Sequence, residues 1–431
     1  MAGPNDNTIT DESLFSDEFL RQLIAVGEVD LLVGIPSLNN ANTIGHVVQA
    51  VHLGFAKYFP RDRTVLLNAD GGSKDGTEEA VTSVSLGDPH RMLAPQLLRT
   101  MHRVTTRYRG AAGRGNALRT ILAAAELLRA KACAIISPDL LSIRPEWIDN
   151  LLRPVYKEQY DLVTPLYRRQ KFDGLLISNL VYPLMRAAYG LRVREPLAGD
   201  FAFSGKLASY LLERGISPED ASPYGVGIWV VTKAIRGGLR VGQSFLGPRI
   251  RASKDSTQDV VSMIRGVVGD LFRCLEAEES LWLDASGSQP VASFGFSYDV
   301  ILEPVRVNRK RLIQMFRNGV TELQDILKTI LGEETFGSVR EMADPSRERL
   351  HFPDELWVKT VYDFASAFHR SVLNREHMMQ ALIPIFRGRV ASFTLERHSA
   401  DDNELEAAIE DLCLAYERLK PYWIERWNLS R

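Results

Sequence analysis

The stretch "TVLLNADGGSKDGT", residues 64–77, contains the local pattern that decides the fold. Its first six residues are a mostly apolar run, which predicts a buried strand. Asp70 follows at once, and Gly71 and Gly72 would let the backbone approach a ligand closely. A helix is expected from Glu78. The segment therefore predicts one strand–loop–helix unit of an α/β protein.

Similar units recur on both sides of this stretch. Further strands are expected at 30–35, 132–137 and 160–167, with helices at 44–56 and 116–131. Strands that alternate with helices favour a mainly parallel sheet covered on both faces. The sequence therefore predicts an α/β, Rossmann-like fold.

The chain is expected to have three parts. Residues 1–29 would hold a polar tail, at 1–12, and a short amphipathic helix, at 16–26. The sheet domain would span 30–280, and a helical domain 281–431. The boundary rests on the small and turn-forming residues of 287–297, which we interpret as a linker.

Beyond that segment, apolar residues recur at helical spacing. The aromatic residues there are expected to pack in the core, among them Trp357, Tyr362, Phe364 and Trp423. Helical spacing alone leaves open whether this part supports a homodimer.

The composition excludes several classes of function. The 431 residues carry a formal net charge of −2, so no global basic field favours nucleic acid or an anionic membrane. Cys133, Cys274 and Cys413 are too far apart for a disulfide framework or a zinc site, which suits a reducing compartment. No apolar stretch approaches the ~20 residues of a membrane span. The polar, acidic start is no secretory signal, and we expect a cytoplasmic protein.

Four polar segments are expected at the carboxyl ends of strands, where open α/β sheets bind ligands. They are "PSLNNANT" at 36–43, the Asp70 loop, "RGAAGRGNAL" at 109–118, and Asp139 in "SPDL". The third segment places Arg109 and Arg114 around glycines ahead of a helix. Cations beside exposed N–H groups suit a phosphate or a nucleotide. Each segment alone is also compatible with an ordinary turn, but the four together in this order are more specific.

These motifs resemble the nucleotide-sugar half of the GT-A glycosyltransferases. Later segments resemble the retaining mannosylglycerate synthases and glucosyl-3-phosphoglycerate synthases, and the resemblance covers about 30–272. The later segments are "YRRQKFDG" (167–174), "REPLAGDFAFSG" (194–205), "YGVGIWV" (224–230) and "LGPRIRASKD" (246–255). The resemblance implies transfer of a hexose from a nucleoside diphosphate sugar to glycerate or 3-phosphoglycerate, with retention.

The resemblance also implies roles for individual residues. The nucleotide sugar would be bound by Pro36, Asn39, Asp70, Arg114 and Asp139. The base of the donor is left open, and both UDP-sugars and GDP-sugars are compatible with these residues.

The small acidic acceptor would be bound by Arg169, Asp173, Ala198, Gly199 and Asp200. An arginine suits a carboxylate because its planar fork donates to two oxygens at once. A helix cap and a turn are the structural alternatives for Asp173 and Asp200.

The chain departs from the family at its metal site. The family has an Asp-x-Asp pair at the third strand, an acidic residue after "YG", and a histidine that binds Mg²⁺ or Mn²⁺. Here these positions hold Ser137, Gly227 and Arg251, and only Asp139 stays acidic. A lone carboxylate is a poor site for such an ion, although waters and diphosphate oxygens can complete the shell.

Three interpretations stay open. In the first, Asp139 and Arg251 are catalytic, and the Arg251 guanidinium neutralises the leaving diphosphate in place of the metal, near Arg249 and Lys254. In the second, catalysis has been lost and the fold binds a nucleotide sugar or a partner. In the third, the chain is an ordinary α/β protein without sugar chemistry, which would need Asp70, Arg114 and Asp139 to lie on different faces of the sheet. For the charges of 248–255 alone, a solvated loop is the structural alternative. The first requires Arg251 and Asp139 to converge.

Overall fold

The structure is a computed structural model that describes most of the 431-residue chain. The described residues are 15–84, 101–110, 113–197, 199–215, 225–252, 259–296, 305–346 and 349–429. The predicted tail at 1–12 lies outside them, as do Ala198 and Lys254.

Eight described strands form one sheet in the order β3-β2-β1-β4-β6-β5-β7-β8. Every strand runs parallel to the others except β6, which is antiparallel to both β4 and β5. The strands are β1 Leu31–Ser37, β2 Thr64–Asp70, β3 His102–Arg107, β4 Ala132–Ile135, β5 Leu162–Arg168, β6 Phe201–Ser204, β7 Val241–Pro248 and β8 Ala292–Phe294. The predicted α/β fold with a mainly parallel sheet is confirmed.

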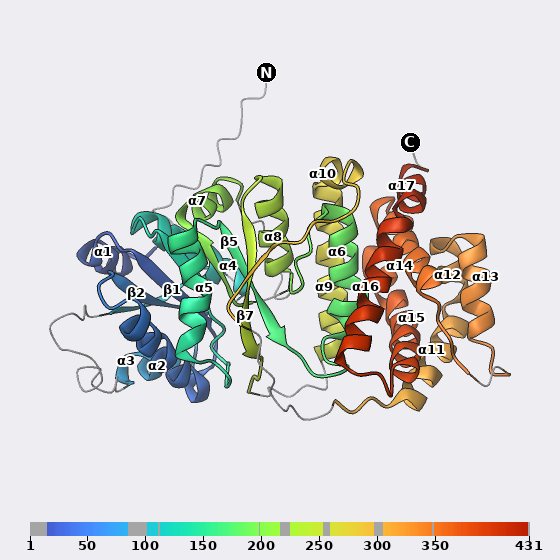
Figure 1. The fold of residues 1–431 in the computed structure, drawn as a ribbon, viewed down its shortest axis with the longest axis horizontal. Coiled ribbons are helices and arrows are strands. Elements are labelled where there is room, and N and C mark those ends of the chain that lie inside the picture. The colour runs from blue at the N-terminus through green and yellow to red at the C-terminus, as the bar shows by residue number, and fades with distance from the viewer. Residues whose placement is uncertain are drawn as a thin grey trace, which may run out of the picture.

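Helices cover both faces of this sheet (Figure 1). Alternate residues of β1 pack on opposite faces, as the two-residue period of a strand requires. Leu31 and Val33 join the core under α2, α3 and α5, while Leu32 joins the core under α1, α4, α7 and α8. These helices are α1 Asp17–Val26, α2 Ala41–Tyr58, α3 Thr77–Ser83, α4 Arg114–Leu127, α5 Pro145–Glu158, α7 Gly205–Glu213 and α8 Val226–Arg236. The helices predicted near 16–26, 44–56 and 116–131 are confirmed.

The rest of the described chain is helical apart from β8, as predicted. It comprises α9 Asp259–Ala277, α10 Glu279–Leu283, α11 Arg309–Glu322, α12 Gln324–Ile330, α13 Glu333–Met342, α14 Asp354–His369, α15 Arg375–Glu396, α16 Asp402–Arg418 and α17 Lys420–Asn428. The aromatic residues predicted to lie in the core are all fully buried: Trp357, Tyr362, Phe364 and Trp423.

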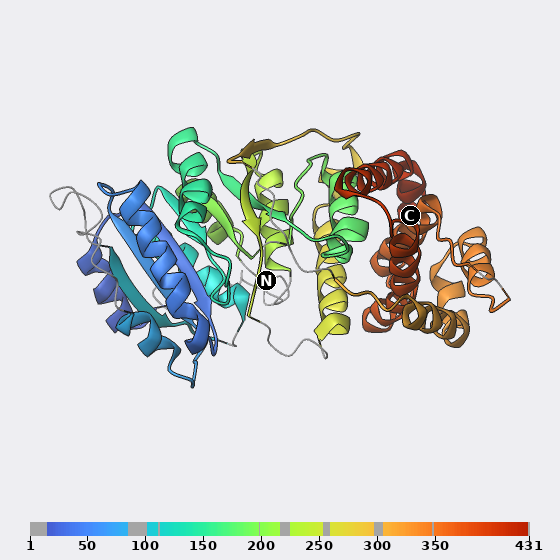
Figure 2. The same cartoon turned by 60° about the horizontal axis from the view of Figure 1, so that its bottom comes forward.

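The helices that follow β8 pack against the π-helical turn η4 Ile177–Val181, α6 Tyr182–Tyr189 and α9 (Figures 1 and 2). One apolar cluster runs without a break from the sheet through α6 and α9 into α14 and α15. Arg186 on α6 is fully buried and pairs with Glu410 and Glu417 on α16, at 2.5 and 2.6 Å. The division at 280/281 stays a prediction, and the apolar core is continuous across it.

The segment interpreted as a linker contains a strand. β8 pairs in parallel with β7 at the edge of the sheet. Phe294 packs edge-to-face on Tyr160 with ring centroids 4.9 Å apart, over Gly242, where a Cβ would lie 2.8 Å from the Phe294 ring. The absence of a side chain at Gly242 therefore lets an aromatic residue anchor a segment whose own composition predicts only a turn.

No helix among the described residues is long and apolar enough to cross a membrane.

Two glycines give matched tests of packing. A Cβ on Gly34 of β1 would lie 2.6 Å from Ile121 of α4, whereas a Cβ on Gly337 of α13 would meet nothing within 4 Å. Because a full core resists an added methyl group, Gly34→Ala should lower the free energy of unfolding by about 1–3 kcal/mol. Gly337→Ala should raise it by roughly 0.5–1 kcal/mol, since alanine favours a helix. Urea titrations of both variants check this, and equal effects would contradict it.

Candidate functional site

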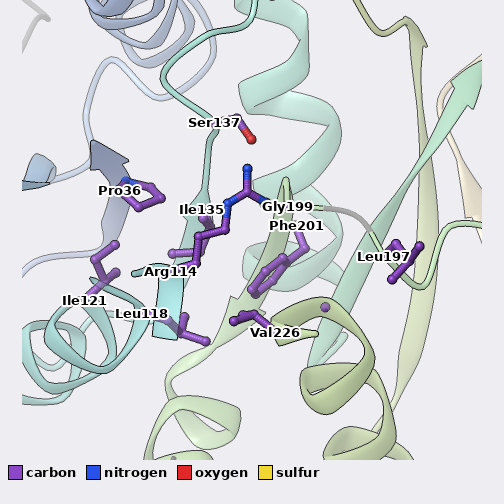
Figure 3. A pocket seen from close by; sticks show the side chains of 11 residues that line it. Pro36, Arg114, Leu118, Ile121, Ile135, Ser137, Leu197, Gly199, Phe201 and Val226 are labelled. Atoms are coloured by element: carbon purple, nitrogen blue, oxygen red, sulfur yellow. The ribbon is translucent and has the colours of Figure 1, made fainter. Parts of the chain in front are cut away.

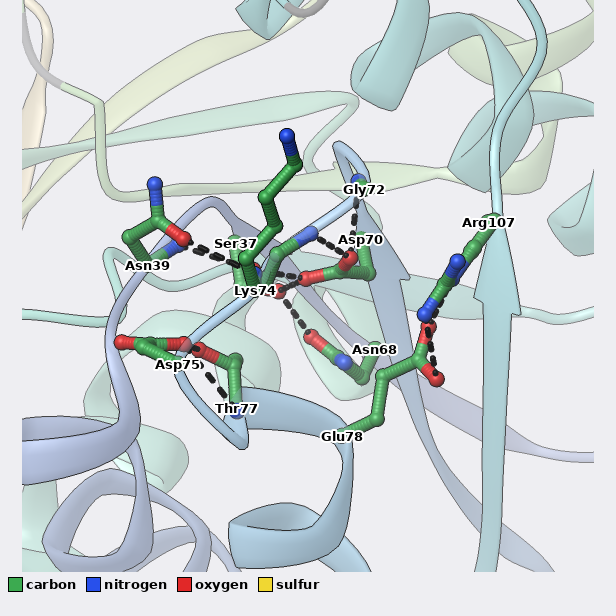
Figure 4. A network of polar contacts seen from close by, with 11 residues as sticks. Ser37, Asn39, Asn68, Asp70, Gly72, Lys74, Asp75, Thr77, Glu78 and Arg107 are labelled. Atoms are coloured by element: carbon green, nitrogen blue, oxygen red, sulfur yellow. Dashed lines mark hydrogen bonds and ion pairs between the residues drawn. The ribbon is translucent and has the colours of Figure 1, made fainter.

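The Asp70 carboxylate organises the loop that follows β2. It is fully buried and accepts hydrogen bonds from the hydroxyls of Ser37 (2.9 Å) and Ser73 (2.5 Å). The backbone N–H groups of Gly72 and Ser73 donate to it at 2.8 and 2.7 Å (Figure 4). Four donors fill the lone pairs of a carboxylate. Asp70 therefore shapes the loop, and its predicted contact with a base or ribose stays a prediction.

Asn39 joins the loops after β1 and β2. Its backbone adopts a left-handed conformation, φ 53°, which asparagine tolerates better than most residues. Its N–H donates to the Ser73 hydroxyl at 2.8 Å, and its Oδ1 accepts from the Lys74 N–H at 3.0 Å. The side chain is exposed, so its amide nitrogen faces solvent beside the strand ends.

A small cavity brings together five positions that the sequence singled out. Pro36, Arg114, Ser137, Gly199 and Gly227 all line it, each from a different part of the chain. The first four are labelled in Figure 3. Its volume is about 30 Å³, which is room for a water molecule. Ser137 and Gly227, two positions where the resemblance implies an acidic residue, thus line the cavity that the Arg114 guanidinium enters.

Arg114 begins α4 and has no hydrogen bond or ion pair among the described residues. Its guanidinium lies against Gly199, where a Cβ would be 2.8 Å from Nη1 and 3.3 Å from the Ser137 hydroxyl. Burial, together with the charges of Arg251 and Arg249, lowers the pKa of Arg114. Arg114 is therefore a desolvated cation that lacks a counter-charge of its own.

Asp200 ties four strand ends together. Its fully buried carboxylate accepts from the Ser137 N–H (2.7 Å) and the Tyr167 hydroxyl (2.6 Å), and pairs with Arg249 (3.2 Å). Burial opposes ionisation, but Arg249 and the two hydrogen bonds hold the pKa of Asp200 below its ordinary value. Burial and the Asp200 charge raise the pKa of Tyr167, so its phenol stays protonated and donates.

Arg251 and Asp139 converge, as the first interpretation requires. The guanidinium Nε and Nη2 lie 3.0 and 2.8 Å from the two carboxylate oxygens. A β-bridge between Leu140 and Arg251 and a hydrogen bond from the Ala252 N–H to the Asp139 carbonyl, 3.0 Å long, align the two segments. Arg251 thus lies on the carboxylate that the resemblance assigns to a metal.

The residues present do not fit a Mg²⁺ or Mn²⁺ site. Such ions take several oxygen ligands, and carboxylates are the strongest that proteins offer. Here both Asp139 oxygens face a guanidinium, and Asp200 is committed to Arg249, Ser137 and Tyr167. Among the residues that the structure describes, no three His, Cys, Asp or Glu side chains gather around one point.

The predicted acceptor residues Arg169 and Asp173 lie together in a second cleft, of about 210 Å³. Arg169 forms a two-pronged pair with Glu195, at 2.5 and 2.7 Å, and contacts Asp173 at 3.1 Å. Sequence reasoning missed Glu195, although it lies in the quoted motif "REPLAGDFAFSG". The positive charge of Arg169, the predicted contact of the acceptor, is therefore already compensated by carboxylates of the chain.

Helix α16 forms the far wall of this second cleft. Arg168 pairs with Asp402 (2.5 Å), and Arg194 pairs with Glu406 (3.1 Å). Lys171 donates to the carbonyl of Ala400, just before that helix. The helical part of the chain thus closes the cleft through charged contacts.

Besides Asn39 and Asp70 in the loops after β1 and β2, the structure places the predicted site residues in two groups. Arg114, Asp139, Gly199, Asp200 and Arg251 form one connected region, while Arg169 and Asp173 belong to the second cleft. The individual binding roles stay predictions. Tyr167 and Glu195 are the partners that sequence reasoning did not name.

No family model matches the chain, and no curated protein matches it. Among solved structures, it is similar to glucosyl-3-phosphoglycerate synthase from Mycobacterium tuberculosis in complex with Mg²⁺ and UDP. Their identity is 23%, with TM-score 0.44, covering 59% of this chain and 83% of that chain. A complex of that enzyme with Mn²⁺, UDP and phosphoglyceric acid is 22% identical, with TM-score 0.43. The match covers 59% of this chain and 82% of that chain. A structure described as a mycobacterial protein is 22% identical, with TM-score 0.43. The match covers 59% of this chain and 77% of that chain. Likenesses of this size leave the activity of this chain open.

Removing the Asp200 charge tests the tie between the strand ends. Asp200→Asn leaves the partly buried Arg249 without its counter-charge, so the free energy of unfolding should fall by about 2–4 kcal/mol at neutral pH. The carboxyl has a lower pKa in the folded chain than its ordinary 3.8. Its stabilisation is therefore present above about pH 4 and is lost as the pH falls through the folded-state pKa. Urea titrations at several pH values measure both effects.

Asp149→Asn is the matched control, because Asp149 pairs with Arg153 on the surface of α5. Such exposed pairs contribute about 1 kcal/mol or less. An Asp200→Asn effect as small as the control, or one that does not shrink in acid, would contradict the role assigned to Asp200.

Proposed function

We propose that the chain is a retaining glycosyltransferase. It moves a hexose from a nucleoside diphosphate sugar to a small hydroxy acid such as glycerate or 3-phosphoglycerate. The observation that carries the proposal is the convergence of Arg114, Ser137, Asp139, Gly199 and Arg251 at the carboxyl ends of the parallel strands. Open α/β sheets bind their ligands at that edge.

The loops after β1 and β2 supply the nucleotide end of the site. Pro36 and the exposed Asn39 lie beside the loop that Asp70 holds in place. A pre-formed loop loses little conformational freedom on binding, which favours affinity. We assign the base and ribose of the donor to this region.

The guanidinium of Arg251 supplies the leaving-group chemistry. As the bond from the sugar to the diphosphate breaks, negative charge develops on the diphosphate oxygens. A cation held in place before the reaction stabilises that charge without reorganisation. Asp139 holds Arg251 in its orientation through a hydrogen bond from Nε and an ion-pair contact with Nη2. No side chain is assigned as a general base.

The second cleft is assigned to the acceptor. It contains four cations, Arg168, Arg169, Lys171 and Arg194, and four carboxylates, Asp173, Glu195, Asp402 and Glu406. The balance of charge suits a small hydroxy acid whose carboxylate exchanges with one of these partners. Arg169 is the proposed contact, because Glu195 fixes its planar fork.

One observation favours a second candidate function. The pairing of Asp139 with Arg251 leaves the carboxylate already satisfied, as it would be in a relative that has lost catalysis. That candidate binds a nucleotide sugar without transferring the hexose.

A transfer assay decides between the two. The full chain is incubated with UDP-glucose, GDP-glucose or GDP-mannose and with D-glycerate or 3-phosphoglycerate, and products are detected by mass spectrometry. We expect one pair to give a glycoside whose anomeric configuration, by NMR, matches that of the donor. Arg251→Ala should reduce turnover by about a hundredfold or more, a loss typical of removing one donor to a developing charge.

Arg129→Ala is the matched control, because Arg129 pairs with Glu28 on the exposed surface. It should leave turnover unchanged. Nucleotide-sugar binding without turnover for any pair would favour the non-catalytic candidate, and neither binding nor turnover would exclude both.

Arg169 is tested through the acceptor. Arg169→Lys keeps the charge but loses the planar fork, so the KM for the acceptor should rise about tenfold while the KM for the donor changes little. Steady-state kinetics with each substrate varied in turn measure the two constants. A rise in the donor KM alone would place Arg169 elsewhere in the mechanism.

A further inference from the structure

Three arginines form one connected cluster at the strand ends. Arg249 and Arg251 lie two residues apart after β7, and each is held by a buried carboxylate, Asp200 and Asp139. Arg114 reaches the same region from the start of α4, and the charges of both other arginines lower its pKa. Ser137 connects them, because its N–H binds Asp200 and its hydroxyl lies near the Arg114 guanidinium.

The cluster carries an excess of positive charge. Its three guanidinium groups face two carboxylates, and the phenol of Tyr167 is neutral. Arg114 has no ion pair in the described part of the chain. Placing like charges together in a partly desolvated site costs free energy unless an anion joins them. The missing partner of this cluster is therefore an anion.

The geometry of the donors indicates which anion. A guanidinium has five N–H groups, and the pair with Asp139 uses two of those on Arg251. The remaining N–H groups of Arg251 are available, since 38% of its side chain is exposed. Planar arginine forks bind phosphate oxygens two at a time. Several such forks side by side suit a ligand with more than one phosphate.

A divalent ion has no place in this cluster. Both carboxylates are committed to arginines, and three nearby guanidinium groups would repel an incoming cation. The guanidinium groups, and not a metal ion, would neutralise the charge of a diphosphate bound here.

We propose that Arg114, Arg249 and Arg251 form a metal-independent diphosphate site. This site deepens the proposed function. Only the assignment of its ligand to the diphosphate of the sugar donor rests on that function. Asp139 and Asp200 are positioning residues that fix two of the arginines. Arg114, the unpaired member, contributes the largest gain in charge pairing when the anion binds.

Inorganic pyrophosphate is the probe that tests the site. Isothermal titration calorimetry with the full chain in EDTA should show saturable binding, and added Mg²⁺ or Mn²⁺ should not strengthen it. Arg114→Ala and Arg251→Ala should each weaken binding at least tenfold, whereas the surface control Arg129→Ala should leave it within twofold. Thermal melts check that each variant is folded.

Gly199→Ala is a second variant that keeps every charge. The new Cβ would lie 2.8 Å from Nη1 of Arg114, at the free end of a flexible side chain, so the guanidinium is displaced while the backbone is unstrained. Pyrophosphate binding should weaken severalfold with the melting temperature nearly unchanged. This variant separates the position of Arg114 from its contribution to folding.

Three outcomes would overturn the proposal: binding that needs a divalent ion, no binding at all, or folded arginine variants that bind as the native chain does. Each is distinguishable from failure of the proposed function. Pyrophosphate binding in EDTA without sugar transfer would keep the site and remove the transferase, and strictly metal-dependent transfer would do the reverse.

Discussion

The architecture of the site depends on the buried carboxylate of Asp200. It binds Ser137 after β4, Tyr167 in β5 and Arg249 after β7, and it lies directly before β6. A buried charge is tolerated only where hydrogen bonds and an opposite charge compensate it. Ser137, Tyr167 and Arg249 together provide this compensation for Asp200. The four strand ends must therefore keep their register for the carboxylate to retain its hydrogen bonds and its ion pair. The antiparallel insertion of β6 into a parallel sheet brings this residue to the edge where ligands bind.

Charge compensation and available space also relate the residues around the cavity to one another. With arginine at 251, a second carboxylate at 137 would compete for a guanidinium that Asp139 already holds. The backbone N–H of residue 137 donates to Asp200, and Gly199 leaves room for the Arg114 guanidinium. The residues at 137, 199 and 251 are thus compatible with one another, whether or not the chain catalyses transfer.

Local patterns predicted much of this fold from the sequence. The strands near 30–35, 64–69 and 132–137 are unbroken apolar runs with polar residues after them, so burial on both faces was evident. Strands β3, β6 and β7 were not predicted. β3 alternates exposed and buried residues at a sheet edge, while β6 has only four residues and is defined by its partners. β8 lies in a segment whose composition predicts a linker, and long-range packing on Tyr160 makes it a strand.

For the site, the motifs singled out Arg114, Asp139, Asp200 and Arg251, and the first interpretation paired Asp139 with Arg251. The partners of Asp200 and Arg169 were not predicted. Asp200 is 33 residues from Tyr167 and 63 from Ser137, and Arg169 is 26 from Glu195. Such pairings arise only when the sheet has formed, and no local period of the sequence encodes them. Whether a given arginine is compensated or unpaired is therefore a property of the fold.

The fully buried Arg186 has a consequence for how the chain unfolds. Its guanidinium on α6 is held by two carboxylates from α16, more than 200 residues further along the chain. Pulling α16 away would leave that cation in an apolar core, which already runs unbroken between the two parts. Separating the two parts is therefore unfavourable, so sheet and helices should melt in one cooperative transition. A chain cut before α16 would lose a wall of the second cleft and leave Arg186 without its counter-charges.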